Sequence, residues 1–152
     1  WDPDFDVEKG TEEFIAAYCG AGAEPVLRYV NALNHRAEEI QSHRTCYAYP
    51  DREFFSPEFM AFARDCFDEA KRNAENADVL ERIQRWEMSI RYVDMFLYHD
   101  KYDDAQLEEE KERFLGDMER LGISHINEGT CGENNRRMIE DYFRSVRPKK
   151  EA

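Results

Sequence analysis

The chain has 152 residues, of which 41% are hydrophobic and 36% charged, and its mean hydropathy is −0.86. This balance is typical of a globular domain, and a chain of this length can bury a core without disulfide or metal support. The net charge of −13 argues against nucleic acid or an anionic membrane as partner, because those ligands select basic surfaces. No hydrophobic run approaches the roughly 18 residues that a membrane span requires.

Hydrophobic residues recur at helical spacing along most of the chain. A first helix is predicted over Val7–Cys19, ending in the segment GAGAE, where Gly20 and Gly22 can adopt the left-handed backbone that terminates helices. Pro25 suits the first turn of a second helix, where its missing N–H costs nothing. The apolar stripe of that helix consists of Val26, Val30, Leu33, Ala37 and Ile40.

The third predicted helix starts at Ser56 and Pro57, a capping residue followed by a proline at the first position. It closes in the asparagine-rich stretch from Asn73 to Asn76. The fourth helix has the most regular pattern, and we interpret Trp86 on its seam as a core residue. The seam steps by three and four residues through Val79, Ile83, Trp86, Ile90, Val93 and Leu97.

A fifth helix begins at Asp103 and Asp104, which favour the positive end of the helix dipole, and closes at Gly122. Residues 123–126 form a short segment that could be extended, and a last helix covers about 135–146. We therefore expect an all-α fold, a bundle of about four long helices with shorter helices at the ends, in a single domain spanning residues 1–152.

The four cysteines are Cys19, Cys46, Cys66 and Cys131. No pair has the two-residue spacing of a zinc knuckle or a redox motif. We interpret them as free thiols on helices, with disulfides as the open alternative.

The most metal-like pattern is His35, Glu39 and His43, which are four residues apart and could line one edge of the second helix. Di-metal bundles, however, also need a Glu-x-x-His motif from each of two helices, and the chain contains none. Runs of acidic residues are interpreted as a solvated helix face, because a glycosidase needs two carboxyls opposed across a cleft. We therefore assign no catalytic, cofactor-binding or metal-binding residue.

Two loops carry the candidate contact residues. The segment TCYAYPDREFF concentrates Tyr47, Tyr49, Phe54 and Phe55 around a proline, and such aromatic residues either bind sugars or partners or cover the end of a bundle. The segment GISHINEGT places His125 and Glu128 in a loop, where polar side chains serve binding or tie the loop to a neighbouring helix. Both alternatives stay open for each loop.

Several stretches together resemble the region that follows the catalytic barrel in a family of large, secreted, α-glucuronidase-like bacterial proteins. The opening WDPDFDVEKGTEEFIAAYCGAGAEPVLRYVNALN resembles the family's entry motif, first helix, Gly/Ala turn and long second helix, whose pattern is here Val26, Tyr29 and Leu33. FMAFARDCFDEAKRNAENADVLERIQR and the GISHI motif follow in the family's order, so the resemblance covers about residues 1–143. The departures are the cysteines and Asn127, where the family more often has a basic residue.

The resemblance implies that the chain is an excised C-terminal helical domain, a domain of unknown function, from a glycoside hydrolase-like parent. The catalytic carboxylates would belong to the barrel, so the domain itself would be a non-catalytic accessory that packs against it. The parent would be extracellular or periplasmic, with a polysaccharide as a further partner and a homodimer as an alternative. The implied contact residues are Trp1, Tyr47, Tyr49, Phe54, Phe55, His125 and Glu128.

Two other functions stay open beside this one. The chain could be a stand-alone carbohydrate-binding or protein-interaction module that uses Tyr47 and Tyr49, or a metal-binding bundle that uses His35, Glu39 and His43.

Overall fold

The computed structural model describes residues 2, 4–40, 49–126 and 133–147, and in these ranges the chain is all-α with no strand. The all-α prediction is therefore confirmed. The helices are α1 (Val7–Cys19), η1 (Gly20–Gly22), α2 (Ala23–Glu39), α3 (Pro57–Asn73), α4 (Ala77–Leu97), η2 (His99–Lys101), α5 (Asp104–Arg120) and α6 (Glu133–Val146). As expected, α2 to α5 are long, with 17 to 21 residues each, and the terminal α1 and α6 are shorter.

Capping side chains set four of the helix starts, as the sequence chemistry requires. The side chains of Asp6, Ser56 and Asn76 each accept a hydrogen bond from the amide three residues later. Asp103 does the same at α5 and also donates its own amide to Gln106 Oε1 at 2.9 Å, which completes a capping box. The predicted start at Ser56 is confirmed.

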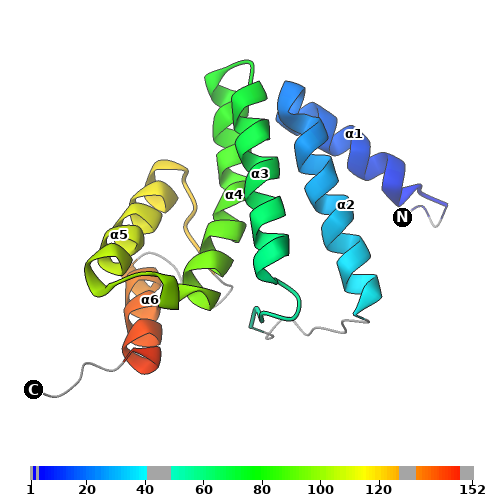
Figure 1. Ribbon diagram of the computed structural model, residues 1–152. Helices are drawn as coiled ribbons and strands as arrows, with labels where there is room; N and C mark the ends of the chain where they lie inside the picture. The colour runs from blue at the N-terminus through cyan, green and yellow to red at the C-terminus, as the bar shows by residue number, and fades with distance from the viewer. Residues whose placement is uncertain (1, 3, 41–48, 127–132, 148–152) are drawn as a thin grey trace, which may run out of the picture. The chain divides into compact units, whose positions relative to one another are not determined.

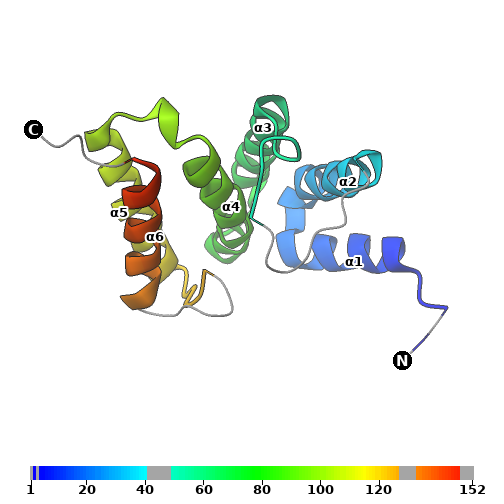
Figure 2. The same cartoon turned by 90° about the horizontal axis from the view of Figure 1, so that it is seen from below.

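The residues cluster into two compact units, Trp1–His99 and Asp100–Ala152, and each is described by itself. The single domain expected over residues 1–152 stays a prediction. In the first unit α2 packs between α1 and α3, α3 packs on α4, and α1 also reaches α4 (Figure 1). Viewed from below, α1 to α4 are seen in a layered arrangement, with α1 and α4 on the same side of α2 and α3 (Figure 2).

The core of the first unit follows the predicted stripes. Ile83 and Ile90 of the α4 seam are almost fully buried, and Val26 of α2 and Phe67 of α3 join them. Trp86 is only partly buried and lies at the margin of this core, so the interpretation of Trp86 as a core residue was too strong.

The corner between α1 and α2 depends on two glycines. Gly20 has φ of +51°, which favours glycine, and its conformation ends α1 as expected. Gly22 has an ordinary φ of −85° and is needed for space instead. A Cβ on Gly22 would lie 2.7 Å from the Ala70 carbonyl oxygen and 2.6 Å from Ile83 Cδ1, so this turn packs directly on the α3 backbone.

In the second unit, ion pairs join α5 and α6. The guanidinium of Arg136 holds Glu112 through both of its terminal nitrogens, with Nη2 2.9 Å from Oε2. Arg147 Nη2 donates to the Tyr102 carbonyl at 3.1 Å and lies 3.1 Å from Asp104 Oδ1. Residues 123–126 are irregular, so the extended segment considered there does not form a strand.

Candidate functional site: an exposed aromatic face

The most distinctive surface of the first unit is a stack of three aromatic rings, which we call the aromatic face: Phe14, Tyr18 and Trp86. Phe14 and Tyr18 are four residues apart on α1, so their side chains are neighbours on the helix surface. Their ring centroids are 5.5 Å apart with planes at 16°, and Trp86 of α4 lies 6.2 Å from each. The two pairs that include Phe14 are stacked and the pair of Tyr18 and Trp86 is tilted, and all three distances lie in the range of favourable aromatic pairs.

The helix geometry explains why this stack reaches the surface. Ile15 and Cys19 occupy the side of α1 that faces the core, with 1% and 0% of their surface exposed. Adjacent residues are about 100° apart around the helix axis, so the Phe14 ring lies at the edge of the side that Ile15 buries. Phe14 consequently keeps 54% of its surface exposed, although it stacks on two other rings.

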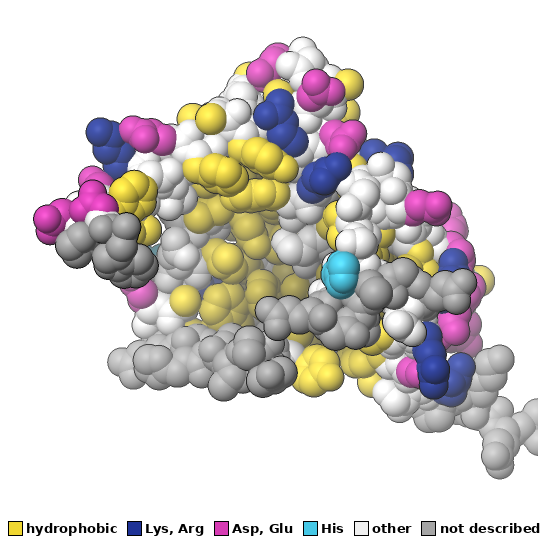
Figure 3. Space-filling view, turned by 180° about the vertical axis from the view of Figure 1, so that it is seen from behind, with side chains coloured by type: hydrophobic (Ala, Val, Ile, Leu, Met, Phe, Trp, Pro, Cys, Tyr) yellow, Lys and Arg dark blue, Asp and Glu magenta, His cyan; other side chains and the backbone are white. Residues whose placement is uncertain are grey.

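Apolar side chains continue from the aromatic face along α1. Val7 lies two turns before Phe14 and is 69% exposed, and Phe5 is 60% exposed. The Phe5 ring folds back over Gly10, where a Cβ would approach its Cζ to 2.4 Å. Phe5 precedes the capping residue and Gly10 is the fourth helical residue, so the ring occupies the space that a side chain at position 10 would fill. Figure 3 shows hydrophobic side chains gathered on the rear of the molecule, at the height where α1 ends and α4 begins in Figure 1.

One cation borders the aromatic face. Arg82 lies one turn before Trp86 on α4, and its guanidinium carbon is 5.4 Å from the centroid of the Tyr18 ring. Its Nε donates to the Asp78 carbonyl at 3.2 Å, within its own helix. Among the described residues, no carboxylate lies within ion-pair distance of Arg82. The face therefore combines one exposed ring and two partly buried rings with a guanidinium whose terminal nitrogens can donate to a ligand.

The predicted aromatic loop turns largely inward. Phe54 is only 6% exposed, and Phe55 is partly buried, with its ring 4.8 Å from that of Phe54 and 6.1 Å from that of Phe59. Arg36 on α2 donates to the Phe54 carbonyl and fixes the loop. Of the loop's described aromatic residues only Tyr49, with 76% exposure, stays at the surface. Tyr47 and Trp1 lie outside the described residues.

The second predicted contact loop is held by a residue that sequence reasoning missed. Asn135 in the first turn of α6 is 5% exposed, donates to the Ser124 carbonyl at 2.9 Å and accepts the Ile126 amide at 3.3 Å. His125 itself is exposed, with its Nδ1 2.7 Å from Ser124 Oγ. A buried polar side chain needs hydrogen-bond partners, and Asn135 finds them in the backbone of this loop. Glu128 lies outside the described residues.

The predicted histidine stripe lies on the surface. His35 Nδ1 is 3.5 Å from Glu39 Oε1, and both side chains are more than half exposed. His43 lies outside the described residues. Within the described part of the chain, no group of three or more His, Cys, Asp or Glu side chains is placed to hold a metal ion.

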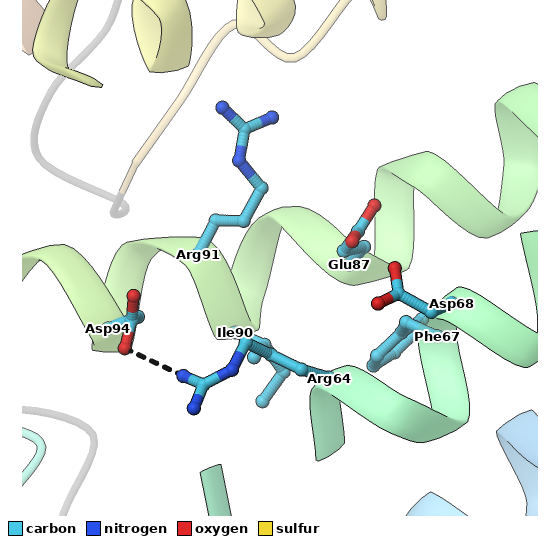
Figure 4. A pocket seen from close by; sticks show the side chains of 7 residues that line it. All are labelled: Arg64, Phe67, Asp68, Glu87, Ile90, Arg91 and Asp94. Carbon is cyan, nitrogen blue, oxygen red and sulfur yellow. Dashed lines mark hydrogen bonds and ion pairs between the residues drawn. The ribbon is translucent and has the colours of Figure 1, made fainter. Parts of the chain in front are cut away.

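A small charged pocket of about 90 Å³ lies between α3 and α4 (Figure 4). Arg64 Nη1 is 3.0 Å from Asp94 Oδ1, and Lys71 bridges Asp68 on its own helix and Glu87 on α4. Burial opposes the ammonium of Lys71, but its hydrogen bonds to Glu87 and Asp68 outweigh this effect and raise its pKa. These charged side chains pair with one another, and two of the ion pairs join α3 to α4.

Two wider hollows lie at the edges of the units. One, of about 600 Å³, separates α1 from α2 and is lined by polar side chains that include Glu8, Glu12 and Glu38. The other, of about 710 Å³, lies beside α5 and α6 and contains Met118 and Asn135. Neither hollow is lined by a Phe, Tyr or Trp ring among the described residues, so the aromatic face is the stronger candidate for a docking surface.

The chain matches no family model, no curated protein and no solved structure. In the described ranges, no helix has the length and apolar character to cross a bilayer.

Proposed function

We propose that this chain is a non-catalytic helical accessory domain that packs against another protein domain through the aromatic face. The observation that carries the proposal is the exposure of Phe14, which leaves 54% of a large apolar side chain in water on top of two stacked rings. Contiguous exposed apolar patches mark interaction sites, and aromatic residues and arginine dominate the binding energy of protein interfaces. Val7 and Phe5 extend the same surface along α1.

The partner that we propose is the one implied by the sequence resemblance. It is the catalytic barrel of a secreted bacterial glycoside hydrolase, in an extracellular or periplasmic setting. In this proposal the barrel carries out catalysis and the helical domain supports it.

Hydrogen exchange tests the proposal directly. We would compare the amides of α1 and α4 in the isolated 152-residue chain with the same amides in the full-length native protein. Docking is expected to slow exchange in α1 and in the first half of α4, with little change in α6. Equal exchange rates in the two proteins would contradict docking through this face.

A matched pair of variants sharpens this test. Phe14→Ser removes the exposed ring of the aromatic face, and Phe62→Ser removes a 38% exposed ring elsewhere, on α3. Burying the exposed half of a phenylalanine contributes about 1 kcal/mol or slightly more, so Phe14→Ser should weaken docking by about five- to tenfold. Phe62→Ser should leave docking unchanged. Equal effects of the two variants would show that general destabilisation, and not the face, is responsible.

Carbohydrate binding is a second candidate, because the rings of Phe14 and Trp86 lie at only 26° to one another and could offer a flat surface to a sugar ring. In a Trp1→Phe background, Trp86 is the only tryptophan and reports on this face by fluorescence. Xylohexaose and cellohexaose are suitable probes. A saturable shift that Phe14→Ala abolishes would support this candidate, whereas a shift abolished by Tyr49→Ala would favour the loop considered from the sequence.

A further inference from the structure

We propose that the aromatic face recognises a carboxylate: the partner segment that covers it presents an Asp or Glu side chain to Arg82, beside an apolar residue that packs on Phe14. This inference rests on the proposed docking function and adds the chemistry of the partner. The occupant is a protein segment, defined by one negative charge next to an apolar side chain.

The first support is the position of Arg82 relative to the rings. Its guanidinium lies 5.4 Å from the centroid of Tyr18, and Tyr18 in turn lies 5.5 Å from Phe14. The exposed ring and the cation therefore flank the same tyrosine. Stacking on an aromatic ring holds a guanidinium in place and leaves its planar edge available for a two-pronged contact with a carboxylate.

The second support is the contrast between Arg82 and its neighbours. Arg85, less than one turn away on α4, already has a carboxylate partner, with its Nη2 2.9 Å from Glu81 Oε1. Carboxylate pairing is common among the described basic residues, including Arg28, Arg64, Lys71, Arg113, Arg120, Arg136, Arg144 and Arg147. Arg82 lies beside the aromatic face, where the Phe14 ring is exposed, and among the described residues it has no carboxylate partner. In a chain of net charge −13, this points to a carboxylate from another protein segment.

The charge of Arg82 acts on the carboxyl of Glu75, but this carboxyl is already engaged elsewhere. Glu75 Oε2 accepts the Ala21 amide at 2.8 Å, and this hydrogen bond is the main reason that its pKa is lowered, with a smaller effect from the charge of Arg82. Glu75 therefore does not provide Arg82 with a direct partner. The cation remains available on the side of the aromatic face.

A pair of small probes tests the charge requirement without the partner. In the Trp1→Phe chain, Trp86 fluorescence would be titrated with 3-phenylpropionate and with its uncharged amide, 3-phenylpropionamide. We expect the carboxylate to bind about 1.5- to 5-fold more tightly, the range for a partly exposed ion pair. Arg82→Gln should remove this preference, Arg82→Lys should keep part of it, and Arg85→Gln should leave it unchanged. Equal binding of the two probes, or no binding of either, would overturn the inference.

The full-length native protein separates this inference from the proposed function. If Phe14→Ser removes the protection of α1 in hydrogen exchange and Arg82→Gln speeds that exchange about 1.5- to 5-fold, both stand. If Phe14→Ser removes protection and Arg82→Gln has no more effect than Arg85→Gln, the carboxylate inference is wrong and the docking function stands. If neither variant changes the exchange of α1, both are wrong. Self-association of the isolated chain that Phe14→Ser abolishes would make a second copy the occupant and overturn the assignment.

Discussion

Raising the pH through the titration of Tyr29 is expected to weaken the first unit by a predictable amount. Tyr29 on α2 is 7% exposed and its ring centroid lies 5.0 Å from that of Phe67. Burial raises the pKa of its hydroxyl from 10.0 to about 12, although a hydrogen bond with Ser89 acts in the opposite direction. The folded state therefore favours the neutral phenol.

The sign of the effect follows from the direction of this change. Below pH 10 the phenol is neutral in both states, and its contribution to stability is fully present. Between pH 10 and about 12 the unfolded chain loses the proton first, so the free energy of unfolding falls. A rise in pKa from 10.0 to about 12 corresponds to a loss of about 2.7 kcal/mol, complete once the pH exceeds the folded value.

Urea unfolding followed by far-UV circular dichroism at a series of pH values measures this loss, with Tyr29→Phe as the control. The variant keeps the ring and lacks the ionisable group, so the other tyrosines titrate equally in both proteins. We expect the wild type to lose about 2 kcal/mol more than Tyr29→Phe between pH 10 and pH 12, with the rest of the roughly 2.7 kcal/mol lost on either side of this window. Parallel pH profiles would refute the reasoning, because they would show that the buried phenol does not control alkaline stability.

Three further predictions concern the first unit and its matched controls. Gly22→Ala should lower the free energy of unfolding in urea by about 1–3 kcal/mol, because its Cβ would press on the Ala70 carbonyl. Gly116→Ala in α5 has open space around it and should raise the free energy of unfolding by about 0.5–1 kcal/mol. The opposite order would contradict the packing described for these two glycines. Glu75→Gln should lower the thermal midpoint at neutral pH and reduce the loss of stability on acidification. The pKa of this carboxyl is lowered in the folded state, so the carboxylate stabilises the fold above the pKa of the unfolded chain and loses this effect as the pH falls through the folded-state pKa. An unchanged acid profile of the variant would refute this. Cys19 and Cys66 are free and buried, and burial raises the pKa of both thiols, so alkylation followed by mass spectrometry should leave them unmodified until the protein unfolds; rapid labelling of either one in the folded protein would contradict their placement.

The helices could be predicted because local chemistry determines them. Ser56 with Pro57 gives the start of α3, and the spacing of Val79, Ile83 and Ile90 gives the buried side of α4. The all-α fold follows from such patterns, since each stripe has to bury itself against another. The free state of Cys19 and Cys66 agrees with the interpretation of the cysteines, whereas Cys46 and Cys131 lie outside the described residues.

The candidate site could not be predicted in the same way. Periodicity places Phe14 and Ile15 on one side of α1, but it does not say which of two adjacent residues faces the core, and here Ile15 is buried and Phe14 is exposed. Trp86 lies on a regular seam, yet its ring reaches the edge where α1 meets α4. The contact between Arg82 and Tyr18 joins residues 64 positions apart, which only the packing of helices reveals.

The sequence also could not decide whether the aromatic residues of the loop before α3 are exposed or buried. An aromatic-rich loop is equally consistent with an exposed platform and with a cover for the core, and the choice depends on contacts with α2 and α3. Arg36 donates a hydrogen bond to the Phe54 carbonyl, and the ring of Phe55 packs on that of Phe59. Phe54 and Phe55 therefore cover the core. Among the described aromatic residues of the loop, only Tyr49 keeps the exposure that a contact role requires.

The hydrogen bond from the Ala21 amide to Glu75 has a consequence for the order of folding. It joins the turn between α1 and α2 to the connection between α3 and α4, across 54 residues of sequence. Each helical hairpin can form from local contacts, whereas this bond requires both hairpins to be present and docked. Stopped-flow chevron kinetics of Glu75→Gln should therefore show faster unfolding at an almost unchanged refolding rate, which would place the union of the two turns after the rate-limiting step.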